Sequence, residues 1–199
     1  GPFVFGDATD LTGQGDWGGL AVNGTAAAGM RSIRYLVVAE SQNGVTLQDV
    51  GADMVIDYLQ VAGAEADGVN IAGGNAHLRH VVINGAADDG LDLNGGFAGG
   101  LQNVIIALGP ERGERGIETR GAATNAILAN VTVLGDGGLG AAHLEGSSVQ
   151  VYRSIYTDWV PEASFDDGCL DIDDVLSPDL RYVDTAFNCT AGPFAAEDE

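Results

Sequence analysis

The sequence contains no lysine, and it has few basic residues of any kind. Its eight basic residues are all arginines, whereas 29 residues are aspartate or glutamate, so the formal net charge is −21 at pH 7. A surface this acidic repels phosphate backbones and anionic lipid headgroups. We therefore expect no nucleic-acid partner and no membrane insertion. Cations, basic partners and neutral glycans remain open as ligands, and the charge also serves solubility in salty water.

Cysteine is scarce as well. Cys169 and Cys189 are the only two, and neither a CxxC motif nor a Cys/His metal spacing is present. We expect one local disulfide, which favours an oxidising compartment. The sequence also shows no signal peptide and no apolar run of membrane length. We expect a mature, exported chain that is secreted or located at the cell surface.

Proline is rare and glycine is abundant, with 5 prolines against 31 glycines in 199 residues. Glycine supplies the sharp backbone corners of tight turns, so this ratio indicates many turns in a folded chain. Hydrophobic residues make up 45% of the sequence, which is enough for a sizeable core. The length suits one domain or one continuous solenoid.

Two sequence markers recur in phase along the chain. The first is a glycine followed by alternating apolar residues, and its strong copies begin at Gly44, Gly68, Gly90 and Gly116, which are 24, 22 and 26 residues apart. The second places apolar residues around a polar or aromatic one, as in Ile56-Asp57-Tyr58-Leu59-Gln60-Val61, and it trails the first by 10 to 12 residues. Such a repeat indicates a solenoid.

Alternation over three to six residues predicts short strands with one buried face. No helical stripe lies between them, and the repeats are too short for the crossover helix of an α/β sheet. We therefore predict an all-β, right-handed parallel β-helix of about seven rungs, in which each rung is covered by its neighbours. A β-sandwich is the rival fold, but sandwiches do not repeat two markers in phase.

The expected organisation is an N-terminal strand or cap over residues 1–16, the β-helix over 17–185 and a C-terminal tail with the disulfide over 186–199. No earlier rung covers Leu20 and Val22, so the first coil presents unpaired backbone groups. We expect that end either to be plugged by residues 1–16 or to be buried against another subunit. Self-association through the N-terminal rung would then give open, head-to-tail assemblies.

Several segments together resemble a group of secreted bacterial β-helix proteins in the pectate-lyase-like superfamily. They are Gly15-Asp16-Trp17-Gly18-Gly19-Leu20, Asp88-Asp89-Gly90, Arg115-Gly116-Ile117-Glu118 and Cys169-Leu170-Asp171-Ile172-Asp173. The resemblance covers most of the chain and implies the β-helix fold. It points to a subgroup without assigned activity, and it implies further N-terminal rungs that this sequence lacks.

The repeat also predicts which side chains share an outer face. If Val69, Leu91 and Ile117 point inward, then Asp92 and Glu118 point outward on adjacent rungs, with Arg120 in the next column. Carboxylates that close share a proton, bind a cation or pair with a base. We expect either a glycan cleft or a solvated polar face that Arg115 and Arg120 neutralise.

The candidate catalytic residues are Asp88, Asp89, Asp92, Glu118 and Arg120. Asp88-Asp89 resembles the paired aspartates of polygalacturonase-like enzymes, but the Ser-His-Gly and Arg-Ile-Lys segments of those enzymes are missing. Asp67 and Asp89 each precede a rung glycine, which is also ordinary turn chemistry. His80 shares a column with Tyr35, Tyr58, Asn103 and Asn130, and we expect it to be a corner residue.

Calcium is the cofactor we consider, with Asp92, Glu118, Asp171 and Asp173 as candidate ligands. Trp17 and Trp159 are candidate sugar platforms, although packing at a rung edge is the simpler role for each. We expect a non-catalytic extracellular protein that binds polysaccharide or a cell-surface glycan, or that assembles with copies of itself. A polysaccharide lyase or glycoside hydrolase acting on the acidic outer face is the alternative.

Overall fold

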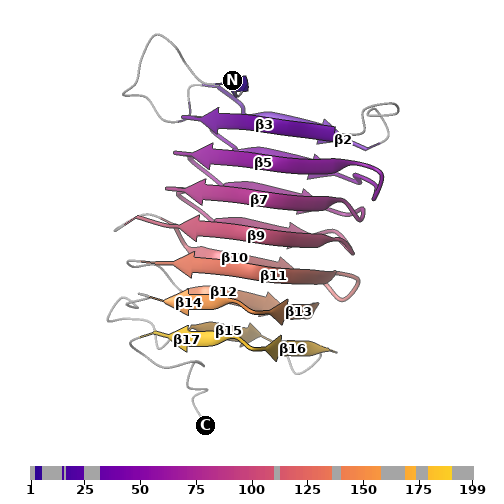
Figure 1. The fold of residues 1–199 in the computed structure, drawn as a ribbon, viewed down its shortest axis with the longest axis vertical. Coiled ribbons are helices and arrows are strands. Elements are labelled where there is room, and N and C mark those ends of the chain that lie inside the picture. Colours follow the sequence, from indigo (N-terminus) through magenta and orange to yellow (C-terminus); the bar gives the residue numbers. More distant parts are fainter. Residues whose placement is uncertain are drawn as a thin grey trace.

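A computed structural model describes residues 3–5, 15, 17–24, 32–109, 113–135, 140–157, 169–173 and 179–189. The described chain is an all-β parallel solenoid, which confirms the predicted fold class. Figure 1 shows the long strands stacked one above another, with the short strands behind them. In the part of the chain that the structure describes, no helix is long and apolar enough to cross a membrane.

The first sheet has ten strands and contains the second sequence marker. Its strands are β1 (Phe3–Phe5), β3 (Ser32–Ala39), β5 (Val55–Ala62), β7 (His77–Asn84), β9 (Gly100–Ala107), β11 (Asn125–Leu134), β13 (Ser148–Tyr152), β14 (Ile155–Thr157), β16 (Leu180–Val183) and β17 (Ala186–Asn188). Five strands, from β3 to β11, are long and unbroken. In the last two rungs the same path is divided into β13 and β14, and into β16 and β17.

The second sheet has seven strands and contains the glycine-led marker. Its strands are β2 (Leu20–Asn23), β4 (Val45–Gln48), β6 (Val69–Ala72), β8 (Leu91–Asn94), β10 (Arg115–Arg120), β12 (Gly140–Glu145) and β15 (Leu170–Asp173). Every pair of neighbours is parallel and in register, so Leu47, Ile71 and Leu93 stack in one buried column. Side chains at alternate positions therefore form matching columns on the outer face.

Glycine begins the strands of the second sheet because the rungs approach closely there. A Cβ atom on Gly90 would lie 2.7 Å from the carbonyl oxygen of Gly116 on the next rung. Gly44, Gly68 and Gly116 also face the backbone of the following rung. The first sequence marker therefore reflects a steric requirement at one corner of every coil.

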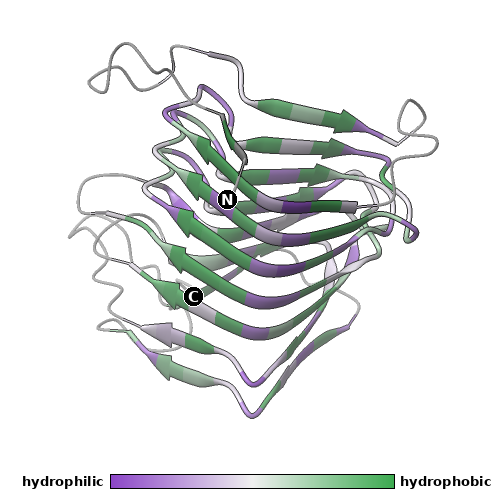
Figure 2. Ribbon diagram, turned by 45° about the horizontal axis from the view of Figure 1, so that its top comes forward, coloured by the Kyte–Doolittle hydropathy of each residue, from purple (hydrophilic) through white to green (hydrophobic). Residues whose placement is uncertain are grey.

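Each long strand bends at a residue with a positive φ, and these residues form a column on the outside of the solenoid. The column contains Tyr35, Tyr58, His80, Asn103, Asn130, Arg153 and Asp184, with φ between 50° and 59°. Non-glycine residues adopt this left-handed conformation uncommonly, so its recurrence at one position of each rung shows that the bend is a regular feature of the fold. Figure 2 shows hydrophilic residues at the bend and hydrophobic residues beyond it.

Side chains at this corner stack from rung to rung, and we call Tyr35, Tyr58, His80, Asn103 and Asn130 the corner ladder. The rings of Tyr35 and Tyr58 are stacked with centroids 4.9 Å apart, and those of Tyr58 and His80 with centroids 4.6 Å apart. Asn130 Nδ2 donates to Asn103 Oδ1 at 3.1 Å. His80 thus lies at the corner, as its column in the sequence indicates.

Both ends of the first sheet are described in part. At the N-terminal end, β1 pairs with residues 36–38 of β3 and so adds a further strand over that part of β3. At the C-terminal end, Cys169 and Cys189 form a disulfide with Cα atoms 5.6 Å apart. The bond joins the residue before β15 to the residue after β17, so it ties the two sheets together.

Candidate functional site

The outer face of the second sheet brings most of the candidate site residues together, and we call this surface the acidic face. Asn70 of β6, Asp92 of β8 and Glu118 of β10 are register partners on adjacent rungs. Their neighbours Val69, Leu91 and Ile117 are buried in the core. The outward column expected from the glycine-led marker is therefore present, with Asp92 next to Glu118.

Arg120 links the two acids of this column. Its Nη2 donates to Asp92 Oδ2 at 2.6 Å, and its Nε lies 3.1 Å from Glu118 Oε2. Asp92 is only 1% exposed, and its Oδ2 also accepts from Asn70 at 2.8 Å and from Asn94 at 2.9 Å. Burial raises the pKa of Asp92, and the Asn94 and Arg120 contacts oppose that shift. This part of the face is thus largely neutralised internally.

Asp89 and Glu118 form a carboxyl pair in which the two groups have opposite pKa shifts. Asp89 lies in the turn before β8 and is 4% exposed. Burial, followed by the charge of Glu118, raises the pKa of Asp89 to about 9. The hydrogen bond from His143 lowers the pKa of Glu118. At neutral pH Asp89 therefore keeps its proton and shares it with an ionised Glu118.

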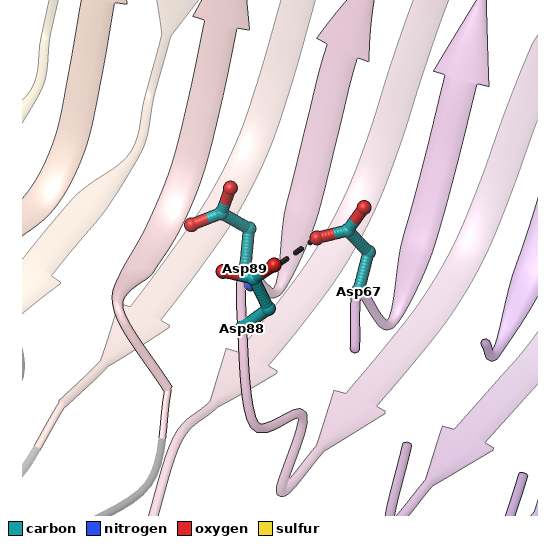
Figure 3. Close-up of side chains that lie close together, drawn as sticks. All are labelled: Asp67, Asp88 and Asp89. Carbon is teal, nitrogen blue, oxygen red and sulfur yellow. Dashed lines mark hydrogen bonds between the residues drawn. The ribbon is translucent and has the colours of Figure 1, made fainter. Parts of the chain in front are cut away.

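A third group of acids, Asp67, Asp88 and Asp89, lies beside this pair, and we call it the aspartate trio. Figure 3 shows the three side chains converging from two adjacent rungs. One carboxyl oxygen from each lies within 4.8 Å of the others. Asp67 Oδ1 accepts from the Asp89 backbone N–H at 3.3 Å, and Asp67 Oδ2 accepts from Asn70 at 3.0 Å.

Not every carboxylate oxygen of the trio has a hydrogen-bond partner in the protein. Among the described residues, Asp89 Oδ1 is buried and has no hydrogen-bond partner. Burial also raises the pKa of Asp67 and of Asp88, because the charged forms lose hydration there. Carboxylate oxygens without nitrogen or sulfur donors are the ligands of hard cations such as Ca²⁺. The trio therefore fits an oxygen-ligated divalent cation.

The outer column continues over the next two rungs. His143 of β12 pairs in register with Glu118 and with Asp171 of β15. His143 Nδ1 lies 3.2 Å from Glu118 Oε1, and its Nε2 lies 3.8 Å from Asp171 Oδ2. Arg115 donates to Asp171 Oδ2 at 3.1 Å. The column therefore alternates acid and base across β10, β12 and β15.

A family model described as a pectate-lyase-like beta helix domain matches residues 32–153. The chain belongs to this family. The match spans every rung that contributes to the aspartate trio and to the Asp89–Glu118 pair, so both lie within the family's β-helix domain. No curated protein and no solved structure matches the chain at a significant level.

The structure brings the candidate catalytic residues of this β-helix domain together, but it pairs most of the candidate calcium ligands with arginines. Asp88, Asp89, Asp92, Glu118 and Arg120 lie together on the acidic face. Of the expected calcium ligands, Asp92, Glu118 and Asp171 are engaged by arginines. Asp173 is in β15, and its side chain lies outside the described residues.

The two tryptophans differ as well. Trp17 is half-buried against the core, and its Nε1 donates to the Ala39 carbonyl at 2.9 Å. That contact corresponds to packing at a rung edge. Trp159 lies outside the described residues.

Sequence reasoning treated Asp67 as turn chemistry and did not place His143 in the site. Both have a signal in the repeat. Asp67 and Asp89 occupy the same position before the rung glycine, so in-register stacking brings them together. Asn70 follows Gly68 by two residues and Asp92 follows Gly90 by two. His143 follows Gly140 by three, so the longer offset obscured its place in the column.

Proposed function

We propose that the chain is an extracellular binding protein whose acidic face holds a calcium ion at the aspartate trio and contacts a glycan through it. The observation that carries this proposal is the convergence of Asp67, Asp88 and Asp89 around a buried carboxylate oxygen that has no partner. A divalent cation would satisfy that oxygen and offset the charge of the neighbouring acids.

The position of the trio supports a role for an external ligand. Asp88 is partly exposed, so a bound ion would face the outside of the solenoid, where hydroxyl or carboxylate oxygens of a sugar can complete its shell. The acidic face also repeats once per rung, with a spacing of about 4.8 Å between adjacent rungs. A regular surface of this kind suits a polymer with a short repeat. The Cys169–Cys189 disulfide supports an oxidising, extracellular compartment.

Calcium titration tests the cation site directly. We expect the wild-type chain to bind Ca²⁺ in isothermal titration calorimetry, and Asp67→Asn and Asp88→Asn each to weaken binding by about tenfold or more. Asp53→Asn makes the same chemical change in the exposed turn before β5 and should leave binding unaltered. Equal affinity in all four proteins would contradict the site.

Glycan binding is tested separately. An array of neutral and acidic polysaccharides, probed with calcium and with chelator, should show binding that requires calcium and that Asp88→Asn abolishes. Binding that survives both chelator and substitution would assign the glycan to another surface.

Glycoside hydrolysis is the second candidate, and the Asp89–Glu118 pair favours it. A protonated acid beside an ionised one is the arrangement of a general acid and its partner. The two carboxyl groups share a hydrogen bond, however, whereas the acids of glycosidases are about 5–10 Å apart to accommodate the sugar. Release of reducing ends by the wild type, lost in both Asp89→Asn and Glu118→Gln, would favour hydrolysis over binding.

A further inference from the structure

Asparagine is followed directly by glycine at four places in the chain, at Asn23, Asn43, Asn84 and Asn94. This dipeptide is chemically reactive, because the glycine nitrogen can attack the side-chain amide carbon of the asparagine. Glycine has no Cβ atom to obstruct that approach. Every other asparagine of the chain is followed by a residue with a side chain, so these four are the steps at which the reaction is least hindered.

The fold engages the glycine nitrogen in three of the four steps. In each of them the backbone N–H of the glycine donates to a carbonyl oxygen of the next rung. The pairs are Gly24 with Gln48 at 2.7 Å, Gly44 with Asp67 at 3.0 Å and Gly85 with Ala107 at 2.9 Å. A nitrogen held in this way must first break its hydrogen bond, so the rung has to open locally before the nitrogen can react.

Gly95, in the fourth step, is the exception. Its N–H has no hydrogen-bond partner among the described residues, and the glycine is exposed to water. The backbone on both sides of it is nevertheless bonded. The Asn94 carbonyl accepts from the N–H of Phe97 at 3.0 Å, and the Gly96 N–H lies 3.3 Å from Thr124 Oγ1. The unpartnered nitrogen therefore lies in an ordered turn.

A change in strand pairing explains why this nitrogen has no partner. β6 pairs with β8 as far as Asn94, whereas β8 pairs with β10 only as far as Leu93. In the first pairing, the glycine after β6 donates to the Asn94 carbonyl at 3.0 Å. The corresponding acceptor for Gly95 is the carbonyl of Arg120, which instead accepts from the Thr124 hydroxyl at 2.7 Å.

The fold also requires glycine at this position. Gly95 has a φ of 60°, and a Cβ atom on it would lie 3.0 Å from the Gly73 nitrogen of the preceding rung. Asn94 is the last residue of β8, and its Nδ2 donates to Asp92 Oδ2 at 2.9 Å. The structure therefore retains a reactive pair, because the glycine satisfies the backbone and the asparagine contacts a buried acid.

We propose that Asn94 is a site of spontaneous deamidation in the folded protein, with water as the only co-reactant. A bond forms between the Gly95 nitrogen and Asn94 Cγ, and the bond from Cγ to Nδ2 breaks. The proton of the Gly95 N–H passes through the solvent to the departing nitrogen, which leaves as ammonia. Water then opens the resulting succinimide ring at one of its two carbonyl carbons. The products are aspartate and isoaspartate at position 94.

Deamidation changes the acidic face beside Asp92. The amide that donates to Asp92 Oδ2 becomes a carboxylate, which cannot donate and which repels an acid at that distance. Isoaspartate in addition lengthens the backbone in the turn where the Asn94 carbonyl accepts from Phe97. Both products therefore weaken the end of β8.

Peptide mapping by tandem mass spectrometry tests the site. The folded chain and the urea-unfolded chain are incubated side by side in slightly alkaline buffer, and the ratio of the two deamidation rates gives the protection of each asparagine by the fold. Trypsin releases residues 80–112 as one fragment, which contains both Asn84 and Asn94. We expect protection of Asn94 to be smaller than that of Asn23, Asn43 and Asn84 by about tenfold or more.

Asn94→Gln should abolish the change at position 94, because glutamine would have to close a larger ring, and it should leave the rates at the other three asparagines unaltered. Circular dichroism checks that the incubated chain stays folded. Protection of Asn94 equal to or greater than that of any of the other three would overturn the proposal.

Substitution by the product tests the consequence for the acidic face. Asn94→Asp should lower the melting temperature, because the buried Asp92 loses a donor and gains an acid beside it. Asn84→Asp adds the same charge at an exposed position of β7 and should melt like the wild type. Equal melting temperatures of the two variants would contradict the effect on the end of β8.

Discussion

The chemistry of individual residues on the acidic face is decided by burial rather than by residue type. Asp92 and Asp89 are both buried aspartates on neighbouring parts of one coil. Asp92 Oδ2 receives Arg120, Asn70 and Asn94, whereas no cationic side chain among the described residues contacts Asp89. One buried oxygen of each acid, Oδ1, has no hydrogen-bond partner in the described part of the chain. Asp92 is therefore paired with a guanidinium through Oδ2. Asp89 either keeps a proton at neutral pH or offers its unpartnered oxygen to a cation. Its ionisation therefore affects both stability and cation binding.

Asp89 is expected to destabilise the fold as pH rises. Its folded pKa of about 9 lies above the ordinary value of 3.8, so the folded state keeps a proton that the unfolded state has released. The contribution of Asp89 to stability is therefore complete below pH 3.8 and is lost as pH rises towards 9. Asp89→Asn removes this dependence, and in chelator at pH 8 it should raise the free energy of unfolding by about 1–3 kcal/mol.

Urea unfolding of the wild type and of Asp89→Asn at pH 5 and pH 8 measures this effect. The difference between the proteins should be larger at pH 8. A variant that is less stable at both pH values would show instead that the Asp89 carboxyl makes contacts that an amide cannot replace.

At the scale of the strand and its corner, two backbone features recur in every full rung. One is the rung glycine before each strand of the second sheet, where the next coil leaves no room for a side chain. The other feature is the residue with a positive φ at the bend of each long strand. The corner residues differ in type along the chain, and side chains of neighbouring rungs contact one another from Tyr35 to Asn130.

Gly90→Ala should destabilise the solenoid by about 1–3 kcal/mol, because its Cβ atom would clash with the Gly116 carbonyl oxygen and with Ile106. Gly109→Ala is the matched control, since a Cβ atom there meets nothing within 4 Å. Thermal unfolding followed by circular dichroism compares the two. Equal melting temperatures would mean that the rungs can move apart without loss of stability.

The Cys169–Cys189 bond should stabilise the last coil, because it closes a 20-residue separation in the unfolded chain. The chain-entropy model gives about 3 kcal/mol for a loop of this size. Replacement of both cysteines by serine should lower the free energy of unfolding by that order. Denaturant unfolding under non-reducing conditions is the measurement, and an unchanged midpoint would assign the bond no role in stability.

For the whole molecule, charge is distributed by sheet. Acids cluster on the outer face of the second sheet, whereas Val37, Val82 and Ile105, at outward positions of the first sheet, are uncharged. Net charge this far from zero still opposes the compact state through self-repulsion.

Salt should therefore stabilise the protein. Between 0.01 M and 0.5 M NaCl the Debye length falls from about 30 Å to below 8 Å, which screens that repulsion. We expect the free energy of unfolding to rise by about 1 kcal/mol, or roughly 2–4 °C in melting temperature. Scanning calorimetry in chelator provides the measurement. A melting temperature that falls with salt would show that the ion pairs of Arg115 and Arg120 outweigh the repulsion.

The fold, the register of the second sheet and the corner column follow from the amino-acid repeat alone. Period-2 alternation and the spacing of Gly68, Gly90 and Gly116 allow one regular stacking, and that stacking places Asp92 beside Glu118. Which acids are neutralised, in contrast, depends on the folded arrangement of the side chains. Arg120 engages Asp92 and Glu118 but leaves the trio unsatisfied, because ionisation depends on burial and distance in three dimensions, which a linear repeat does not encode.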